Sequence, residues 1–208
     1  RMEVSGSRIS RVDFAAYITQ VSDVIAAMTK DGYPHPTAFE IETAVAFLFF
    51  KKENCDLVLL EVGMGGNLDA TNIIKNTLLA VLVSISMDHM SFLGNTLAQI
   101  AEKKAGIIKD GCRVVTARQK PEAMQVIERI SREHGAKCTI ADASEAEMLK
   151  ESCLGQTIRY RGEEYEIPLA GVYQKENAVV ALNALKVLDE LGFSTAAEQK
   201  KEGLRTVN

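Results

Sequence analysis

Apolar residues recur at spacings of three and four in the first part of the chain, which is the period of an amphipathic helix. The first such pattern follows Ser10-Arg-Val-Asp13, a capping-box-like start, and stops at Asp31-Gly32. A second capping box, Thr37-Ala-Phe-Glu40, opens a helical pattern that runs to about Lys52. The chain therefore predicts two successive helices.

Two later segments, residues 56–62 and 78–86, are continuously apolar instead of alternating. Such runs are typical of parallel strands that are covered on both faces. Helical and strand patterns then alternate, with helices expected at 96–109 and 121–134 and strands at 113–117 and 137–141. This alternation implies right-handed crossovers and an α/β fold, a doubly wound, mostly parallel sheet flanked by helices.

The pattern changes after residue 156. Residues 157–168 alternate between apolar and polar around Arg161-Gly162-Glu163, which predicts a hairpin at an edge of the sheet. Residues 177–191 predict a last helix, closed by Gly192. No internal repeat and no linker interrupts the chain, so we expect residues 1–208 to form a single domain.

The composition of the chain argues against nucleic acids and membranes as partners. The 208 residues are 47% hydrophobic and 25% charged, and the net charge of −4 with dispersed basic residues argues against a nucleic-acid groove. The four cysteines are far apart and have no zinc-ligand spacing, which favours reduced thiols in a cytoplasmic protein. The apolar runs are too short to cross a bilayer, so we expect no membrane partner.

Candidate chemistry lies just past the two apolar runs. In open α/β sheets, ligands bind beyond the carboxyl ends of the strands, where this chain places Glu61 and His89. Each residue also has a structural explanation. Glu61 could be a solvated charge at a strand end, and His89 could be a structural histidine.

Lys104 is a third candidate because of its position on a helix. It shares one arc with Leu97, Ala101 and Ile108, whereas Lys103 lies about 100° away. A lysine within an apolar stripe can extend its amine to the rim. Alternatively, the amine is desolvated and is a nucleophile or a target for modification.

A glycine-rich loop, Leu60-Glu-Val-Gly-Met-Gly-Gly-Asn-Leu-Asp-Ala-Thr-Asn72, follows the first apolar run. Leucine at position 68 replaces the third glycine of a dinucleotide fingerprint, which excludes a Rossmann cofactor. The glycines could serve only a tight turn. The Asp-Ala-Thr-Asn string supplies polar groups that could bind a polar heterocycle or cap the next turn.

Four segments together resemble the Mur-ligase superfamily and, within it, the folylpolyglutamate and dihydrofolate synthases. They are FEIETAVAFLFF, LLEVGMGGNLDATN, SISMDHMSFLGNTLAQIAEKKAGIIK and LAGVYQKENAVVALNAL, in family order and at family-like spacing. The resemblance implies a P-loop NTPase-like central domain. It also implies an ATP-dependent ligase that adds L-glutamate to a folate or pteroate through an acyl phosphate.

The resemblance also implies a metal site. Glu61 and His89 match the family's magnesium-associated glutamate and histidine, and Lys104 matches a lysine that is carbamylated there. A carbamate would replace a poorly solvated ammonium with a group that helps to hold a cation. Because histidine is an unusual partner for Mg²⁺, the expected ion is Mg²⁺ or Mn²⁺.

Two further sets of residues are implied in the same way. Gln174 and Asn177 match the family's nucleotide-contacting string, although Asn177 could simply cap a helix. The positions that match the lining of the pterin pocket are Thr37, Phe39, Asp69 and Ala70.

The family's P-loop and its C-terminal glutamate-binding domain have no counterpart within residues 1–208. We therefore expect the P-loop upstream and the C-terminal domain downstream, and a chain that is inactive alone and monomeric. Asn67 stands where many relatives have arginine, which leaves the preferred folate form open. The alternatives are a cell-wall amino-acid ligase of the same superfamily and a non-catalytic ligand-binding module.

Overall fold

The structure is a computed structural model, and it describes residues 2–87 and 90–207. These residues form two compact units. The first contains Arg1–Met64 and Asp69–Ile73, and the second contains Gly65–Leu68 and Ile74–Asn208. The expectation that residues 1–208 form a single domain stays a prediction.

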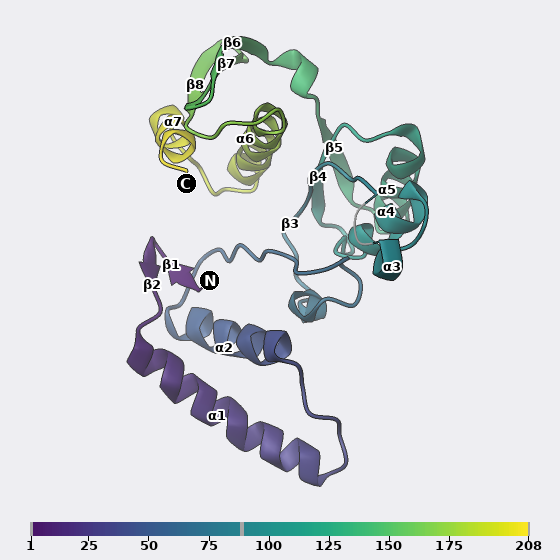
Figure 1. The fold of residues 1–208 in the computed structure, drawn as a ribbon, viewed down its shortest axis with the longest axis vertical. Coiled ribbons are helices and arrows are strands. Elements are labelled where there is room, and N and C mark those ends of the chain that lie inside the picture. Colours follow the sequence, from purple (N-terminus) through teal and green to yellow (C-terminus); the bar gives the residue numbers. More distant parts are fainter. Residues whose placement is uncertain (1, 88–89, 208) are drawn as a thin grey trace. The chain divides into compact units, whose positions relative to one another are not determined.

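Helices dominate the first unit (Figure 1). Its elements are β1 (Glu3–Val4), β2 (Ser7–Arg8), α1 (Arg11–Lys30), α2 (Ala38–Lys52) and the 3-10 helix η1 (Ala70–Ile73). The Ser10 side chain accepts a hydrogen bond from the Asp13 backbone at 3.0 Å, and both bonds of the Thr37–Glu40 capping box are present. Both predicted helices are thus confirmed, together with their starting signals.

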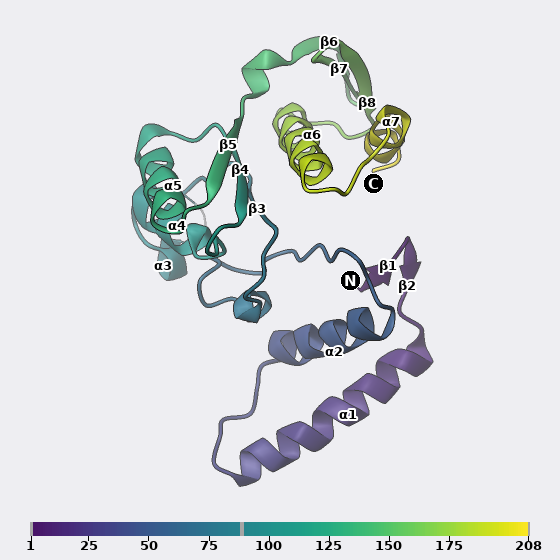
Figure 2. The same cartoon turned by 180° about the vertical axis from the view of Figure 1, so that it is seen from behind.

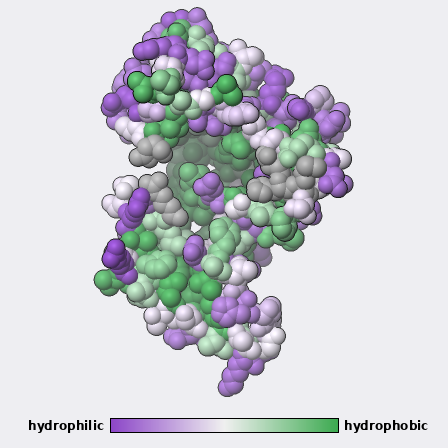
Figure 3. Space-filling view, in the orientation of Figure 1, coloured by the Kyte–Doolittle hydropathy of each residue, from purple (hydrophilic) through white to green (hydrophobic). Residues whose placement is uncertain are grey.

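This unit buries few side chains, chiefly Ile25, Val45 and Phe49. Large apolar side chains such as Val12 and Val24 stay exposed, and Figure 3 shows apolar residues at the surface over α1 and α2. Two helices that pack on each other leave part of each apolar stripe open, because each helix covers only one side of the other.

The expected strand over residues 56–62 does not form. No strand in the described part of the chain pairs with this segment, and Leu59 is 90% exposed. A strand needs a neighbouring backbone for its hydrogen bonds, and an apolar sequence alone does not supply one.

The second unit is built on a parallel sheet with the order β3-β4-β5. The strands are β3 (Leu79–Leu82), β4 (Arg113–Ala117) and β5 (Lys137–Ala141). The helices α3 (Met90–Leu93), α4 (Leu97–Ala105) and α5 (Pro121–Glu133) lie in the connections, and α6 (Gln174–Glu190) follows later. The predicted α/β fold with a parallel sheet is confirmed, although β3 is shorter than the apolar run 78–86.

Both faces of this sheet are buried, as Figures 1 and 2 show for the helices on its two sides. Val114 packs into one apolar core with Ile100 of α4 and Ile127 of α5. The next residue, Val115, packs into a second core with Val179 of α6. Successive side chains of a strand point to opposite faces, so a continuously apolar strand is what two covered faces require.

A separate antiparallel sheet, β6-β7-β8, covers the second core. It consists of β6 (Glu147–Ser152), β7 (Gly155–Tyr160) and β8 (Glu163–Ile167), with the 3-10 helix η2 (Ala143–Glu145) before it and α7 (Ala197–Arg205) near the end of the chain. The predicted hairpin is β7–β8, turning at Arg161 and Gly162, which both have positive φ. Its expected place at the edge of the parallel sheet is wrong, because β7 pairs with β6 instead.

No helix in the described ranges is long and apolar enough to span a membrane. The four cysteines are unpaired, as expected. Burial raises the pKa of the Cys112 and Cys138 thiols, which disfavours the reactive thiolate.

Candidate functional site

The carboxylate of Asp69 organises the part of the glycine-rich loop that belongs to the first unit. Its Oδ2 accepts hydrogen bonds from the backbone N–H of Gly63 at 2.9 Å and of Met64 at 3.0 Å. Its Oδ1 accepts from the Thr71 backbone at 2.9 Å and from the Thr71 hydroxyl at 2.5 Å. One side chain thereby connects the start of the loop to η1.

These contacts decide the charge of Asp69. Partial burial opposes ionisation, but the Thr71 hydroxyl and the N–H groups of Met64, Thr71 and Gly63 outweigh it and lower the pKa. An ionised carboxylate has about four acceptor positions. The loop occupies all four, so the carboxylate of Asp69 acts as a scaffold for the loop.

The residues predicted to line a pterin pocket share this unit. A Cβ atom on Gly63 would lie 2.9 Å from Cζ of Phe39 and 3.2 Å from Oδ2 of Asp69, so the Phe39 ring rests directly against the loop. Ala70 begins η1, and Thr37 is the N-cap of α2. The structure therefore brings Phe39 and Asp69 together at Gly63, whereas the Thr37 side chain is engaged in its capping box.

The middle of the loop, residues 65–68, belongs to the second unit and packs against the end of α4. The Asn67 N–H donates to the Lys103 carbonyl at 3.0 Å. A Cβ on Gly66 would lie 2.7 Å from the Lys103 oxygen and 2.8 Å from the Lys104 oxygen, and a Cβ on Gly106 would lie 2.6 Å from Cβ of Asn67. Here glycine is required for close approach of two backbones.

Lys104 lies where the sequence pattern predicted. Ala101 and Ile108 on its arc are buried, Lys104 itself is half-buried, and Lys103 is exposed. The packing described above places the glycine-rich loop on the backbone of this lysine.

The other two residues of the predicted metal site are Glu61 and His89. Glu61 is exposed and belongs to the first unit, whereas Lys104 belongs to the second. His89 lies outside the described residues. The three-residue metal site therefore stays a prediction.

The two predicted nucleotide residues lie on the first turn of α6. The helix begins at Gln174, three residues before the expected start, and Tyr173 is its N-cap. The Asn177 N–H donates to the Tyr173 carbonyl, and the Asn177 amide lies 3.5 Å from Oε1 of Gln174. The alternative explanation that Asn177 caps the helix is wrong, because Asn177 lies inside it.

Sequence reasoning missed Gln119, which is only 9% exposed and follows the end of β4. Its Oε1 accepts from the Ile85 N–H at 2.9 Å, and its Nε2 donates to the Val83 carbonyl at 2.9 Å. Past the end of β3, this amide replaces the backbone of a neighbouring strand. The only sequence signal is a polar residue directly beyond a strand end, which is too common to single out.

Replacing Gln119 by alanine is expected to lower the free energy of unfolding by about 2 kcal/mol, because the buried N–H of Ile85 loses its partner. Urea unfolding of the chain measures this change. Gln125→Ala, at an exposed position of α5, is the matched control and should change stability by less than about 0.5 kcal/mol. Equal stability of the two variants would contradict the structural role of Gln119.

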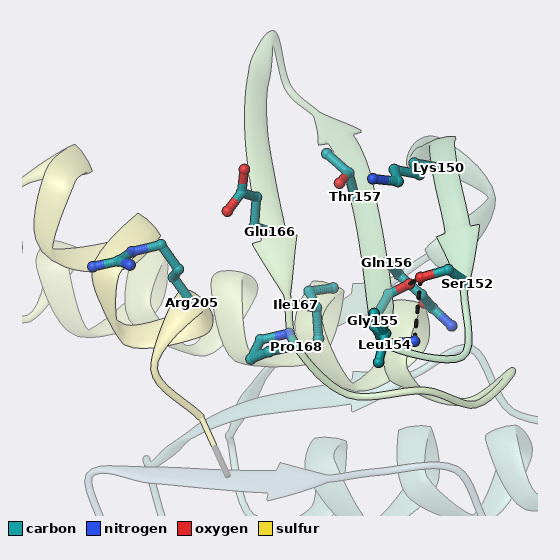
Figure 4. Close-up of a pocket in the computed structure, with 10 residues that line it drawn as sticks. All are labelled: Lys150, Ser152, Leu154, Gly155, Gln156, Thr157, Glu166, Ile167, Pro168 and Arg205. Carbon is teal, nitrogen blue, oxygen red and sulfur yellow. Dashed lines mark hydrogen bonds between the residues drawn. The ribbon is translucent and has the colours of Figure 1, made fainter.

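The second unit also has a groove that contains none of the predicted residues (Figure 4). It has a volume of about 280 Å³ and lies along the β6–β7 turn and the end of β8, with Lys150, Glu166 and Arg205 at its rim. Its rim carries two basic side chains and one acidic side chain, so the groove does not favour a ligand of one charge over the other.

Residues 13–185 match the model of the Mur ligase middle domain. The chain is 39% identical over 208 residues to the dihydrofolate synthase/folylpolyglutamate synthase of Bacillus subtilis, covering 96% of this chain and 48% of that protein.

The chain is also similar to solved structures of folylpolyglutamate synthases. The Mycobacterium tuberculosis folylpolyglutamate synthase complexed with ADP and AMPPCP is 32% identical, with a TM-score of 0.84 over 99% of this chain and 49% of that chain. An FPGS–AMPPCP–folate complex is 29% identical, with a TM-score of 0.80 over 93% of this chain and 48% of that chain. The chain spans about half the length of these relatives.

Proposed function

Because the chain belongs to the Mur ligase middle-domain family, we propose that the complete protein is an ATP-dependent ligase that joins L-glutamate to a folate or pteroate. The observation that carries this proposal is 39% identity, across nearly the whole chain, to a dihydrofolate synthase/folylpolyglutamate synthase. The solved complex of a relative with AMPPCP and folate supports the same pair of substrates.

The proposed reaction has two steps. A carboxylate oxygen of the folate attacks the γ-phosphorus of ATP, which forms an acyl phosphate and releases ADP. The amine of L-glutamate then attacks the acyl carbon, so that an amide forms, a proton is lost and phosphate leaves. The protein has to position charged groups and exclude water during both steps.

The donor set proposed for the cation fits its chemistry. Glu61 and a carbamate on Lys104 supply oxygen atoms, which suit Mg²⁺ or Mn²⁺, and His89 supplies a nitrogen. When bound, the cation would neutralise charge on the transferred phosphoryl group.

The carbamate would form when Nζ of Lys104 adds to the carbon of CO₂ and loses a proton. The half-buried position of Lys104, next to buried Ala101 and Ile108, supports this modification, since a carbamate can be held by a cation where an ammonium cannot. An unmodified amine in the complete, bicarbonate-supplied and metal-loaded protein would contradict it.

The remaining predicted residues have assigned parts in the proposal. Thr37, Phe39 and Ala70 contribute to the pterin pocket, in which Phe39 offers a flat apolar face, and Asp69 shapes the loop that borders it. Gln174 and Asn177 contact the nucleotide. We further propose a cytoplasmic monomer, in keeping with four unpaired cysteines.

Phosphate release by the complete protein tests the proposal. With ATP, Mg²⁺ and L-glutamate present, dihydropteroate or tetrahydrofolate is expected to raise the rate above that without an acceptor. The acceptor that stimulates more identifies the preferred folate form. A folded protein that binds ATP but responds to neither acceptor would contradict the assignment and favour another Mur-type substrate.

A further inference from the structure

The carbonyl of Gly171 connects the first turn of α6 to the antiparallel sheet. This oxygen accepts a hydrogen bond from the Gln174 N–H at 3.1 Å, which belongs to the start of the helix. It also accepts one from Nε2 of Gln156 at 2.6 Å. Gln156 belongs to β7, so the second bond connects the helix start to the middle strand of the antiparallel sheet.

Gly171, whose carbonyl accepts these two hydrogen bonds, has an unusual backbone conformation. Its φ is +127°, a backbone conformation that residues with a side chain rarely adopt, although no atom lies within 4 Å of an added Cβ. Glycine is therefore required by the conformation of the chain and not by a lack of space. The residue whose carbonyl accepts both hydrogen bonds thus has a backbone conformation that favours glycine.

The buried amide of Gln156 is only partly satisfied. The side chain is 3% exposed, and its Oε1 has no hydrogen-bond partner among the described residues. A buried acceptor without a partner costs free energy that an apolar side chain of similar volume would avoid. What the amide supplies in return is its bond to Gly171.

We propose that Gln156 is a positioning residue for the nucleotide. By fixing the Gly171 carbonyl, it sets the orientation of the turn that carries Gln174 and Asn177. This inference rests on the proposed function, because it assumes that these two residues contact ATP.

The neighbouring residue provides a matched control. Successive side chains of a strand point to opposite faces. In the close-up, Thr157 lies beside Lys150, its partner across the strands, while Gln156 extends away from both (Figure 4). Thr157→Ala thus changes the same strand without touching Gly171.

The test is calorimetric titration of the complete protein with AMPPCP, combined with steady-state kinetics. Gln156→Met keeps the volume and removes the donor, and is expected to weaken AMPPCP binding about tenfold, as the loss of one hydrogen bond can. Gln156→Glu should weaken it further, because a carboxylate repels the carbonyl. For Gln156→Met, the KM for ATP should rise, whereas the KM for the pterin acceptor and the unfolding temperature should stay at their wild-type values. Thr157→Ala should match the wild type in all of these measurements.

Other outcomes separate the two proposals. If Asn177→Ala weakens AMPPCP binding but both Gln156 variants bind like the wild type, Gln156 is not a positioning residue and the proposed function stands. Parallel changes in the KM of both substrates, with a lower unfolding temperature, would reduce Gln156 to a structural role. A wild-type protein that binds no AMPPCP would overturn the proposed function, and this inference with it.

Discussion

Gly66→Ala is expected to lower the activity of the complete protein about 100-fold and its free energy of unfolding by about 3 kcal/mol. The new Cβ would lie 2.7 Å from the Lys103 oxygen and 2.8 Å from the Lys104 oxygen. Both are backbone atoms at the end of a packed helix, so neither can rotate away. The loop has to move off α4, which changes the surroundings of Lys104.

Urea unfolding and phosphate release measure the two effects. Gly203→Ala is the matched control: Gly203 lies in α7 with open space around its Cβ position, and alanine there should stabilise the chain by about 0.5 to 1 kcal/mol. Gly106→Ala approaches the same contact from the helix side, at 2.6 Å from Cβ of Asn67, and should resemble Gly66→Ala. Wild-type stability in both variants would show that the loop does not pack this closely.

Asp69→Asn is expected to lower the free energy of unfolding by about 3 kcal/mol and to abolish most of the proposed activity. An amide can accept with its oxygen only, and its NH₂ group would face two of the four donors that now point at the carboxylate. The hydrogen bonds that connect the loop to η1 would be lost, and Phe39 would no longer be held against Gly63.

The pH dependence of stability distinguishes this effect from simple loss of packing. The folded state lowers the pKa of Asp69 below its ordinary value of 3.8, so the unfolded state binds the proton more readily. The stability from Asp69 is therefore complete above that value and is lost as the pH falls through the folded pKa. The difference in stability between wild type and Asp69→Asn should shrink on acidification below about pH 4.

Chemical unfolding between pH 7 and pH 3 provides the measurement, with Asp23→Asn as a control at an exposed position of α1. The control should match the stability of the wild type at pH 7. A difference for Asp69→Asn that stays constant with pH would mean that the charge of Asp69 does not stabilise the loop.

Local signals in the sequence determined a large part of this protein. The caps at Ser10 and Thr37 set the starts of α1 and α2, and the apolar run of β4 was found with its observed bounds. The place of Lys104 on a buried stripe also followed from helical period alone. In each case the residues that decide the outcome lie within a few positions of one another, so the chain carries the information locally.

Other features needed contacts between distant segments. An apolar run is compatible with a strand, but residues 56–62 have no strand partner in the described chain, and pairing of β7 with β6 decided where the hairpin lies. Likewise, the four donors on Asp69, the approach of Gly66 to α4 and the bond from Gln156 to Gly171 depend on the three-dimensional path of the backbone. The sequence thus determined which residues are candidates for chemistry. The tertiary structure decided which side chains hold the loop and the start of α6 in place, because a hydrogen bond or a steric contact exists only once both partners have been brought together.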